Sequence, residues 1–266
     1  MADRPLRLLI IGAHPDDADY FAGGTAALYR AARHIVKMVS LTNGDAGHHA
    51  LRGPELARRR RAEAAAAGGV IGATYDVLDN PDGQLLPSLE NRFQVIRLIR
   101  SFRPDLVLTH RPNDYHPDHR YTSQLVQDAA YMVTVPAICP DTPHLPVDPV
   151  IAYLPDQFQK PYPFRPTVAV DVTPVFDRLI AMLHCHQSQF YEWLPYNGRY
   201  ADQVPAEDAA RRAWLAEHIA PRLRVQAERF RELLGRPAEY AEGFEACEYG
   251  APLDAVAVER LFGFLK

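Results

Sequence analysis

Cysteine is scarce in this sequence of 266 residues, and the three that occur, Cys139, Cys185 and Cys247, share no C-x-x-C spacing. An odd number of isolated cysteines predicts neither a disulfide framework nor a cysteine-ligated zinc site. Such sparse cysteine usage is typical of proteins in a reducing compartment. We therefore expect a cytoplasmic protein.

Long apolar runs and an excess of positive charge are also missing. The aliphatic stretch at residues 8–13 is far shorter than the ~18 apolar residues of a membrane span, and no signal peptide is apparent. The 29 Lys and Arg residues against 33 Asp and Glu residues give a formal net charge of −4. Nucleic-acid binding depends largely on Lys and Arg that neutralise phosphates. We expect a soluble protein with a small-molecule substrate, and neither a membrane nor a nucleic acid as partner.

Flexible linkers, internal repeats and low-complexity tracts are absent, so nothing marks a boundary between two domains. We expect residues 1–266 to form a single domain, which is long enough to bury a core without disulfides. The oligomeric state is not apparent from the sequence, and a homo-oligomer is compatible with it.

The sequence does contain short apolar runs that alternate with segments of helical periodicity. We expect strands at residues 6–11, 35–41, 105–109 and 167–172. We expect helices at residues 21–33, 53–72, 88–102, 174–186 and 208–234, and mostly loop in the proline-rich stretch 136–166. This order predicts a doubly wound, Rossmann-like α/β fold with a mostly parallel sheet. In such folds the ligand binds at the carboxyl ends of the strands.

The first motif with chemical potential is Ala-His-Pro-Asp-Asp at residues 13–17, directly after the first predicted strand. If Pro15 starts a helical turn, the imidazole of His14 and the carboxylate of Asp17 converge on one point, while Asp16 projects to another side. This arrangement suits two metal ligands and one free base. The alternative is that the two aspartates only complement the dipole of the helix that follows.

A second cluster follows the strand predicted at 105–109, because three of the 11 histidines lie within residues 110–119. The sequence His-Pro-Asp-His at 116–119 repeats the pattern of a proline turn with two potential ligands three residues apart. One of these histidines, together with His14 and Asp17, makes three protein ligands and leaves an open position, as in catalytic zinc sites.

Two other classes of function use similar features. The ligands of a non-haem iron oxygenase are also two histidines and a carboxylate, but its usual setting is a β-barrel and Asp16 has no task in it. A non-catalytic sugar-binding or nucleotide-binding module is the other alternative. The first strand–helix turn lacks the Gly-x-Gly-x-x-Gly pattern that cradles a pyrophosphate, which disfavours a nucleotide.

Four motifs, at residues 13–17, 23–25, 42–47 and 116–119, resemble in order and spacing the LmbE/PIG-L family of metal-dependent N-deacetylases. Weaker similarity at 186–189 and 240–245 extends the resemblance over nearly the whole chain. It implies a zinc-dependent hydrolase that removes an N-acyl group, in most cases N-acetyl, from an amine. An N-acetylglucosamine-type sugar or glycoside is the favoured substrate.

The resemblance also implies roles for individual residues. His14, Asp17 and His119 are the expected ligands of one divalent metal, for which Zn²⁺ is favoured and Fe²⁺ also fits. Asp16 is the expected general base, which takes the proton of the metal-activated water that attacks the amide. A carboxylate bound to a dication cannot do this, so the two adjacent aspartates have different tasks.

Three further residues around the second motif are candidates for the site. The resemblance assigns oxyanion stabilisation to His116 in its protonated form, which can later protonate the departing amine. Asp118 is expected to tune or orient His116. Asp114 is a candidate substrate contact, with a loop-capping role as the alternative.

Arg60 is the last site candidate and belongs to a run of four arginines. Helical spacing places Arg60 between Leu56 and Ala64 on an apolar face, whereas Arg59 falls on the face expected to be solvated. The Arg-x-x-Glu spacing from Arg60 to Glu63 resembles a family feature in which the arginine helps to bind substrate. Arg60 is therefore expected to bind substrate, with an inward structural ion pair as the alternative.

Overall fold

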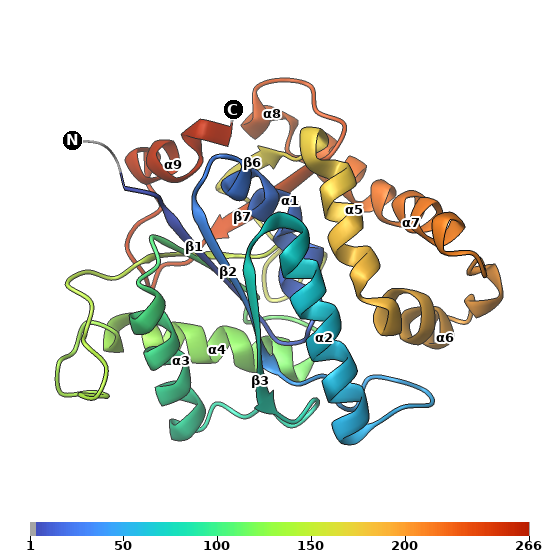
Figure 1. Cartoon of the computed structure of the whole chain (residues 1–266). Coiled ribbons are helices and arrows are strands. Elements are labelled where there is room, and N and C mark those ends of the chain that lie inside the picture. The colour runs from blue at the N-terminus through green and yellow to red at the C-terminus, as the bar shows by residue number, and fades with distance from the viewer. Residues whose placement is uncertain (1–3, 266) are drawn as a thin grey trace.

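Seven strands form one sheet in the computed structural model, which describes residues 4–265 (Figure 1). Their order is β3-β2-β1-β4-β5-β7-β6. The pairs from β3 to β5 are parallel, and β7 runs antiparallel to both β5 and β6. The strands are β1 Arg7–Gly12, β2 Ile35–Thr42, β3 Thr74–Asn80, β4 Leu106–Thr109, β5 Val150–Tyr153, β6 Val168–Asp171 and β7 Ala241–Ala246. The predicted α/β fold with a mostly parallel sheet is confirmed.

Helices cover both faces of the sheet, with α2 and α5 on one side and α3 and α4 on the other (Figure 1). The α-helices are α1 Asp17–Ala31, α2 Gly53–Ile71, α3 Leu89–Phe102, α4 Pro117–Met132, α5 Phe176–Cys185, α6 Leu194–Gly198, α7 Asp208–Arg229, α8 Arg231–Leu234 and α9 Ala255–Phe262. The doubly wound arrangement is therefore confirmed. None of the helices within residues 4–265 combines the length and the apolarity that a membrane crossing needs.

Strand β1 shows why the sheet is covered on both sides. Leu8 and Ile10 belong to the core under α1, α2 and α5, whereas Leu9 and Ile11 belong to the core under α3 and α4. All four side chains are completely buried. Because successive side chains of a strand point to opposite faces, a continuous apolar run requires cover on both. The carboxyl end of β1, and the motif that follows it, therefore lie in the middle of the sheet and not at its border.

The Gly-Gly-Thr motif lies at a break inside α1, where Ala22 has a non-helical φ of −142°. Just beyond it, the backbone N–H groups of Gly24 and Thr25 each donate to the carboxylate of Glu242 in β7 at 2.8 Å. A Cβ at Gly24 would lie 2.6 Å from Val172, so the close approach requires glycine. The motif therefore joins α1 to the antiparallel strand of the sheet.

Some elements differ from those expected. Strands β3, β5 and β7 and helix α4 were not predicted. The helix expected at 208–234 is interrupted, because α7 ends at Arg229 and a separate turn, α8, follows. Helix α1 begins at Asp17, four residues before the expected start.

Candidate metal centre and active site

The turn after β1 brings His14 and Asp17 together. The backbone N–H groups of Asp16 and Asp17 donate to the carbonyl of His14 at 2.9 and 3.2 Å. The Nδ1 atom of His14 lies 3.4 Å from Oδ2 of Asp17. Pro15 occupies the turn and the helix begins two residues later, so the residues converge through the turn itself.

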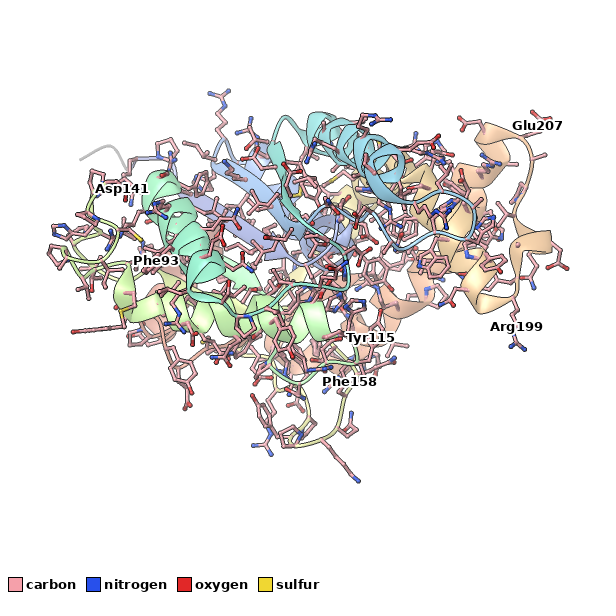
Figure 2. All side chains as sticks on the ribbon, turned by 90° about the horizontal axis from the view of Figure 1, so that it is seen from below. Phe93, Tyr115, Asp141, Phe158, Arg199 and Glu207 are labelled. Carbon is pink, nitrogen blue, oxygen red and sulfur yellow. The ribbon has the colours of Figure 1, made fainter. Side chains whose placement is uncertain are left out.

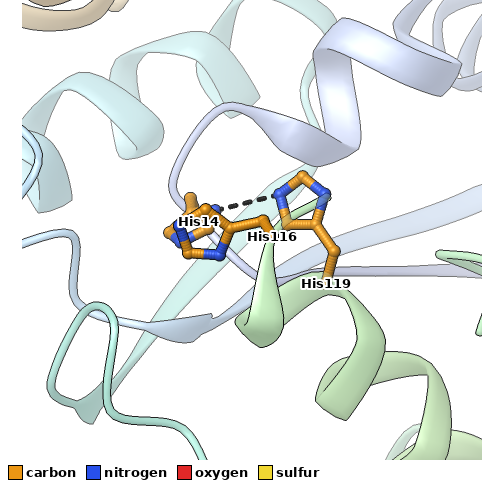
Figure 3. A group of neighbouring side chains, drawn as sticks. All are labelled: His14, His116 and His119. Carbon is orange, nitrogen blue, oxygen red and sulfur yellow. Dashed lines mark hydrogen bonds between the residues drawn. The ribbon is translucent and has the colours of Figure 1, made fainter. Parts of the chain in front are cut away.

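The second motif reaches the same point from the end of β4. His116 caps α4, and its Nδ1 accepts the backbone N–H of Asp118 at 3.2 Å. In the first turn of α4, Nε2 of His119 lies 3.2 Å from Nδ1 of His14, the contact drawn as a dashed line in Figure 3. Nε2 of His119 is also 3.5 Å from Oδ1 of Asp17. The imidazole nitrogens of His14 and His119 and the carboxylate of Asp17, which are all potential metal ligands, thus face one another.

The two oxygens of Asp17 have different surroundings. Its Oδ2 accepts the backbone N–H groups of Ala13 and His14 at 2.9 and 2.7 Å, and it lies 3.1 Å from Nε2 of His110. Oδ1 faces His119 instead. The backbone therefore fixes the carboxylate through Oδ2 and leaves Oδ1 free to coordinate a metal ion.

Carboxylates also stand behind the two imidazoles. Nε2 of His14 lies 3.2 Å from Asp82 and 3.4 Å from Asp118, at ion-pair distances without aligned hydrogen-bond geometry. Nδ1 of His119 lies 3.2 Å from Oδ2 of Asp114. A histidine that ligates a metal usually has its other nitrogen held by a carboxylate or carbonyl. The donor set therefore fits a divalent cation with ordered histidine ligands.

The charges around His14 also fit a cation. Burial alone lowers the pKa of His14, but Asp118, Asp17 and Asp82 outweigh it and raise that pKa well above 6.5. Burial opposes the charge of Asp17, yet neighbouring histidines, His119 foremost, hold its pKa well below 3.8. Without a metal ion, the surrounding carboxylates therefore favour the protonated, positively charged form of His14.

Other donor sets exist in the same neighbourhood. One is His14, His116 and His119 (Figure 3), a second is Asp17, His110 and His119, and a third is His14, Asp82, His116 and Asp118. His14, Asp17 and His119 all line the large cavity described below, whereas His110, His116, Asp82 and Asp118 do not. Access from this cavity favours the set expected from the sequence.

Asp16 lies beside the cluster and lines the same cavity. Its side chain is buried, and its Oδ1 has no hydrogen-bond partner among the described residues. Burial first, and then the charge of Asp17, raise the pKa of Asp16 to about 6. A carboxylate with a free oxygen and such a pKa is suited to accept a proton near neutral pH.

Asp118 contacts both His14 and His116. Its fully buried carboxylate accepts the N–H of Gly83 at 2.7 Å and faces His14, while its backbone N–H donates to Nδ1 of His116. Burial lowers the pKa of His116, and the charges of His14 and His119 lower it further, against the charges of Asp118 and Asp82, which raise it. In the metal-free chain the net direction favours a neutral His116, and the roles expected of His116 and Asp118 stay predictions.

Asp114 is held at both oxygens by the second motif. Oδ1 accepts the backbone N–H of His116 at 2.9 Å, and Oδ2 faces His119. The first contact is the loop cap considered as the alternative role. The carboxylate also lines the cavity, so the predicted substrate contact stays a prediction.

Arg60 faces inward as expected and is 2 % exposed. Its Nη2 donates to the carbonyl of Gly47 at 2.6 Å and to the side chain of Gln189, which lines the cavity. Arg59 is not on a solvated face, because its guanidinium bridges Glu63 and Glu192. That expectation is wrong. It failed because Glu192 is 133 positions away in sequence, whereas Glu63 lies at the helical spacing of four residues.

A cavity of about 630 Å³ extends from the metal cluster to helix α7. Tyr115 and Phe158, whose rings are 6.2 Å apart, lie together on its lining (Figure 2). Sequence reasoning missed its other walls, since they come from distant elements. These include Tyr20, Phe21, Asp156, Gln189, Phe190 and five residues of α7.

Comparison with known proteins finds a family match to nearly half of the chain. The family model described as "PIG-L: GlcNAc-PI de-N-acetylase" matches residues 9–130, which contain every site residue predicted from the sequence. Residues 9–130 form a PIG-L family domain. The resemblance drawn from the four motifs is confirmed.

Relatives of this PIG-L domain protein include two kinds of enzyme. Diacetylchitobiose deacetylase of Thermococcus kodakarensis is 29 % identical in an alignment of 201 residues that covers 71 % of this chain and 74 % of that protein. The 4-oxalmesaconate hydratase of Pseudomonas putida is 28 % identical in an alignment of 196 residues that covers 71 % of this chain and 76 % of that protein. The structure of N,N'-diacetylchitobiose deacetylase from Pyrococcus horikoshii has a TM-score of 0.71 at 26 % identity, and covers 91 % of this chain and 83 % of its own. These relatives support an enzymatic function.

Proposed function

We propose that the chain is a metal-dependent N-deacetylase that hydrolyses the acetamido group of an N-acetylglucosamine-type sugar or glycoside. The observation that carries the proposal is the convergence of His14, Asp17 and His119 at one end of a cavity, with Asp16 beside them. The relatives named as diacetylchitobiose deacetylases support the substrate class.

His14, Asp17 and His119 would hold one divalent ion, with Zn²⁺ favoured and Fe²⁺ also fitting this donor set. Such an ion supplies Lewis-acid chemistry, since it polarises an amide carbonyl and makes water more acidic. Asp16 accepts the proton of the attacking water at its free oxygen. Asp17 does not compete for this task, because backbone N–H groups hold its Oδ2.

His116 acts on the other side of the reacting amide. Because its Nδ1 accepts the N–H of Asp118, the ring hydrogen lies on Nε2. This N–H is available to the oxyanion that develops as water adds to the carbonyl. The negative charge then favours uptake of a proton from solvent at Nδ1 of His116, in place of the contact with Asp118, so that Nε2 can pass its proton to the departing amine. The proton taken by Asp16 returns to solvent.

The substrate contacts come from both halves of the chain. Asp114 lines the cavity beside the metal ligands, and Arg60 acts on it through Gln189. Residues of α7 complete the opposite wall. We therefore propose that residues 1–266 act as one catalytic domain.

Hydration of a carbon–carbon double bond in an unsaturated polycarboxylate is the second candidate. The similarity to 4-oxalmesaconate hydratase favours it. A base such as Asp16 beside a cation site can activate water for addition to the double bond of an unsaturated acid as well as to an amide carbonyl.

A substrate panel distinguishes the two candidates. The protein, reconstituted with Zn²⁺ or Fe²⁺ and kept free of oxygen, is incubated with N-acetylglucosamine, N,N'-diacetylchitobiose and simple acetamides, and acetate is measured. Parallel samples contain conjugated unsaturated tricarboxylates, whose hydration lowers the ultraviolet absorbance. We expect acetate from the sugars. Loss of absorbance without any acetate would contradict the deacetylase and support the hydratase, and turnover without oxygen excludes an oxygenase.

A further inference from the structure

Helix α7 presents one face to the cavity, opposite the metal cluster. Pro221, Arg222, Val225, Gln226 and Arg229 all line the cavity. Steps of three, four and seven residues return to the same side of a helix. The face therefore brings two arginines and one side-chain amide to the cavity. These residues lie far along the chain from the PIG-L match at residues 9–130.

Arg222 has unused hydrogen-bond donors. Its guanidinium lies 4.2 Å from the ring centroid of Tyr20, and its Nη2 donates to the Tyr20 carbonyl at 2.6 Å. Its Nε and Nη1 are buried and have no partner among the described residues, and neither has Oε1 of Gln226. Leaving buried polar groups unpaired is costly. A ligand in the cavity would supply the missing partners after a small shift of the side chains.

The two arginines of this face form no ion pair, although the charge of the buried Glu242 acts on Arg222 at longer range. Arg229, which is exposed, donates to the carbonyl of Phe164 at 2.6 Å. No carboxylate in residues 4–265 pairs with Arg222 or Arg229 at ion-pair distance. By contrast, Arg224, on the exposed side of the same helix, pairs with Glu239 at 2.8 Å.

Asp156 is the acidic residue of the cavity lining that lies outside the two motif regions, 13–17 and 110–119. Its Oδ1 lies 3.0 Å from Nη1 of the buried Arg111, which compensates its charge. The lining therefore combines aspartates and a cation site from these two regions with arginines of α7 that form no ion pair. A ligand that contacts both sets carries an acylated amine and, some distance away, a negative charge.

We propose that the α7 face binds an anionic group of the substrate, a carboxylate or a phosphate, through Arg222 and Arg229 with Gln226 between them. The guanidinium fork matches the geometry of both anions. The inference rests on the proposed deacetylase function and narrows its substrate to a charged N-acylated sugar.

The test compares kcat/KM of the metal-reconstituted protein for N-acetylglucosamine, its 1-phosphate, its 6-phosphate and its uronic acid. We expect at least one charged sugar to exceed the neutral one by roughly 10- to 100-fold, the range of one or two charge-assisted hydrogen bonds. The double variant Arg222→Gln/Arg229→Gln should lose this preference, and Arg224→Gln should keep it. The phosphate and uronic acid arms show which anion is preferred. Equal kcat/KM for all four sugars, or a preference that survives in the double variant, would overturn the proposal.

Calorimetry separates this proposal from the deacetylase function. The metal-reconstituted wild type should bind at least one of glucosamine 1-phosphate, glucosamine 6-phosphate and the uronic acid of glucosamine more tightly than glucosamine, and the double variant should bind all four equally. Melting temperatures within a few degrees of the wild type show that the variant is folded, and Arg229→Gln alone serves if the double variant is not. Arginine-dependent binding without any acetate release would contradict only the deacetylase. Equal binding of all four amines by the wild type would overturn the anion site.

Discussion

The Nδ1 atom of His14 lies 3.2 Å from the Nε2 atom of His119, although 105 positions separate the two residues in sequence. They follow β1 and β4, which are neighbouring parallel strands. The carboxyl ends of parallel strands meet at one edge of a sheet, where ligands bind in open α/β folds. Two short motifs thus form one site because the sheet order brings β4 next to β1.

Removal of any one of the three expected ligands should lower the metal content. His14→Ala, Asp17→Ala and His119→Ala each delete one donor, so we expect substoichiometric metal by elemental analysis after reconstitution. The fold should persist, since both cores lie beneath the site. His144, an exposed histidine far along the chain, provides the matched control His144→Ala. Full metal content in all three ligand variants would show that other residues hold the ion.

The pH dependence of kcat/KM should report on Asp16. Its pKa is raised to about 6 by burial and by Asp17. A general base acts when deprotonated, so activity should fall as the pH decreases through this range. The positive charge of a bound ion displaces this limb toward lower pH. The profile is measured at saturating metal, and activity that rises as the pH falls from neutral would contradict the assignment of Asp16 as base.

The arginine run allows a comparison on one helix. Arg60→Ala leaves the carbonyl of Gly47 and the amide of Gln189 without their donor, at ~1–3 kcal/mol for each buried group. We expect a lower free energy of unfolding and a raised KM, with unchanged metal content. Arg58, which is exposed, replaces Arg59 as the control, because Arg59 is bound to Glu192. Equal KM values for Arg58→Ala and Arg60→Ala would show that Arg60 does not support the cavity.

Arg100 is expected to be the arginine on which stability depends most. Its completely enclosed guanidinium donates to six carbonyl oxygens, all of them between residues 132 and 142. Arg100→Met should lower the free energy of unfolding by more than ~3 kcal/mol, because several buried acceptors lose their donor at once. Chemical denaturation measures the difference. Arg97, an exposed residue on the same helix, pairs with Asp141, and Arg97→Ala should change stability little. Similar losses from both variants would contradict this account of the 132–142 loop.

Three of the four predicted strands are central. β1, β2 and β4 contain mainly apolar runs, and such runs are recognisable without knowledge of their partners. The fourth, β6, is an edge strand that was recognised from its run of β-branched residues and has alternating burial. β3 is an edge strand in which only Tyr75 is buried, and β5 lies between prolines. β7 carries the buried Glu242, whose partners are 217 and 218 positions away. Its burial depends on contacts that no local pattern reveals.

The residues of the candidate site can likewise be divided into those that the sequence predicted and those that it did not. Residues 13–17 and 116–119 are short motifs whose spacing alone indicates convergence, and the structure brings them together. Asp82 follows the unpredicted β3, and its contact with His14 was therefore missed. The cavity wall from α7 depends on how α7 packs against α5 and β7 and on the contact of Arg222 with Tyr20 of α1. Residues close in sequence were predictable, and residues brought together only by packing were not.

The central claim is that Asp16 acts as the base beside a cation held by His14, Asp17 and His119. Its most direct test is acetate release from N-acetylglucosamine or N,N'-diacetylchitobiose by the wild type and by Asp16→Asn, with metal content measured in the same samples. The account predicts equal metal content and a ~10²–10⁴-fold loss of kcat in the variant, the usual contribution of general-base catalysis. Near-normal acetate release by metal-loaded Asp16→Asn would contradict it.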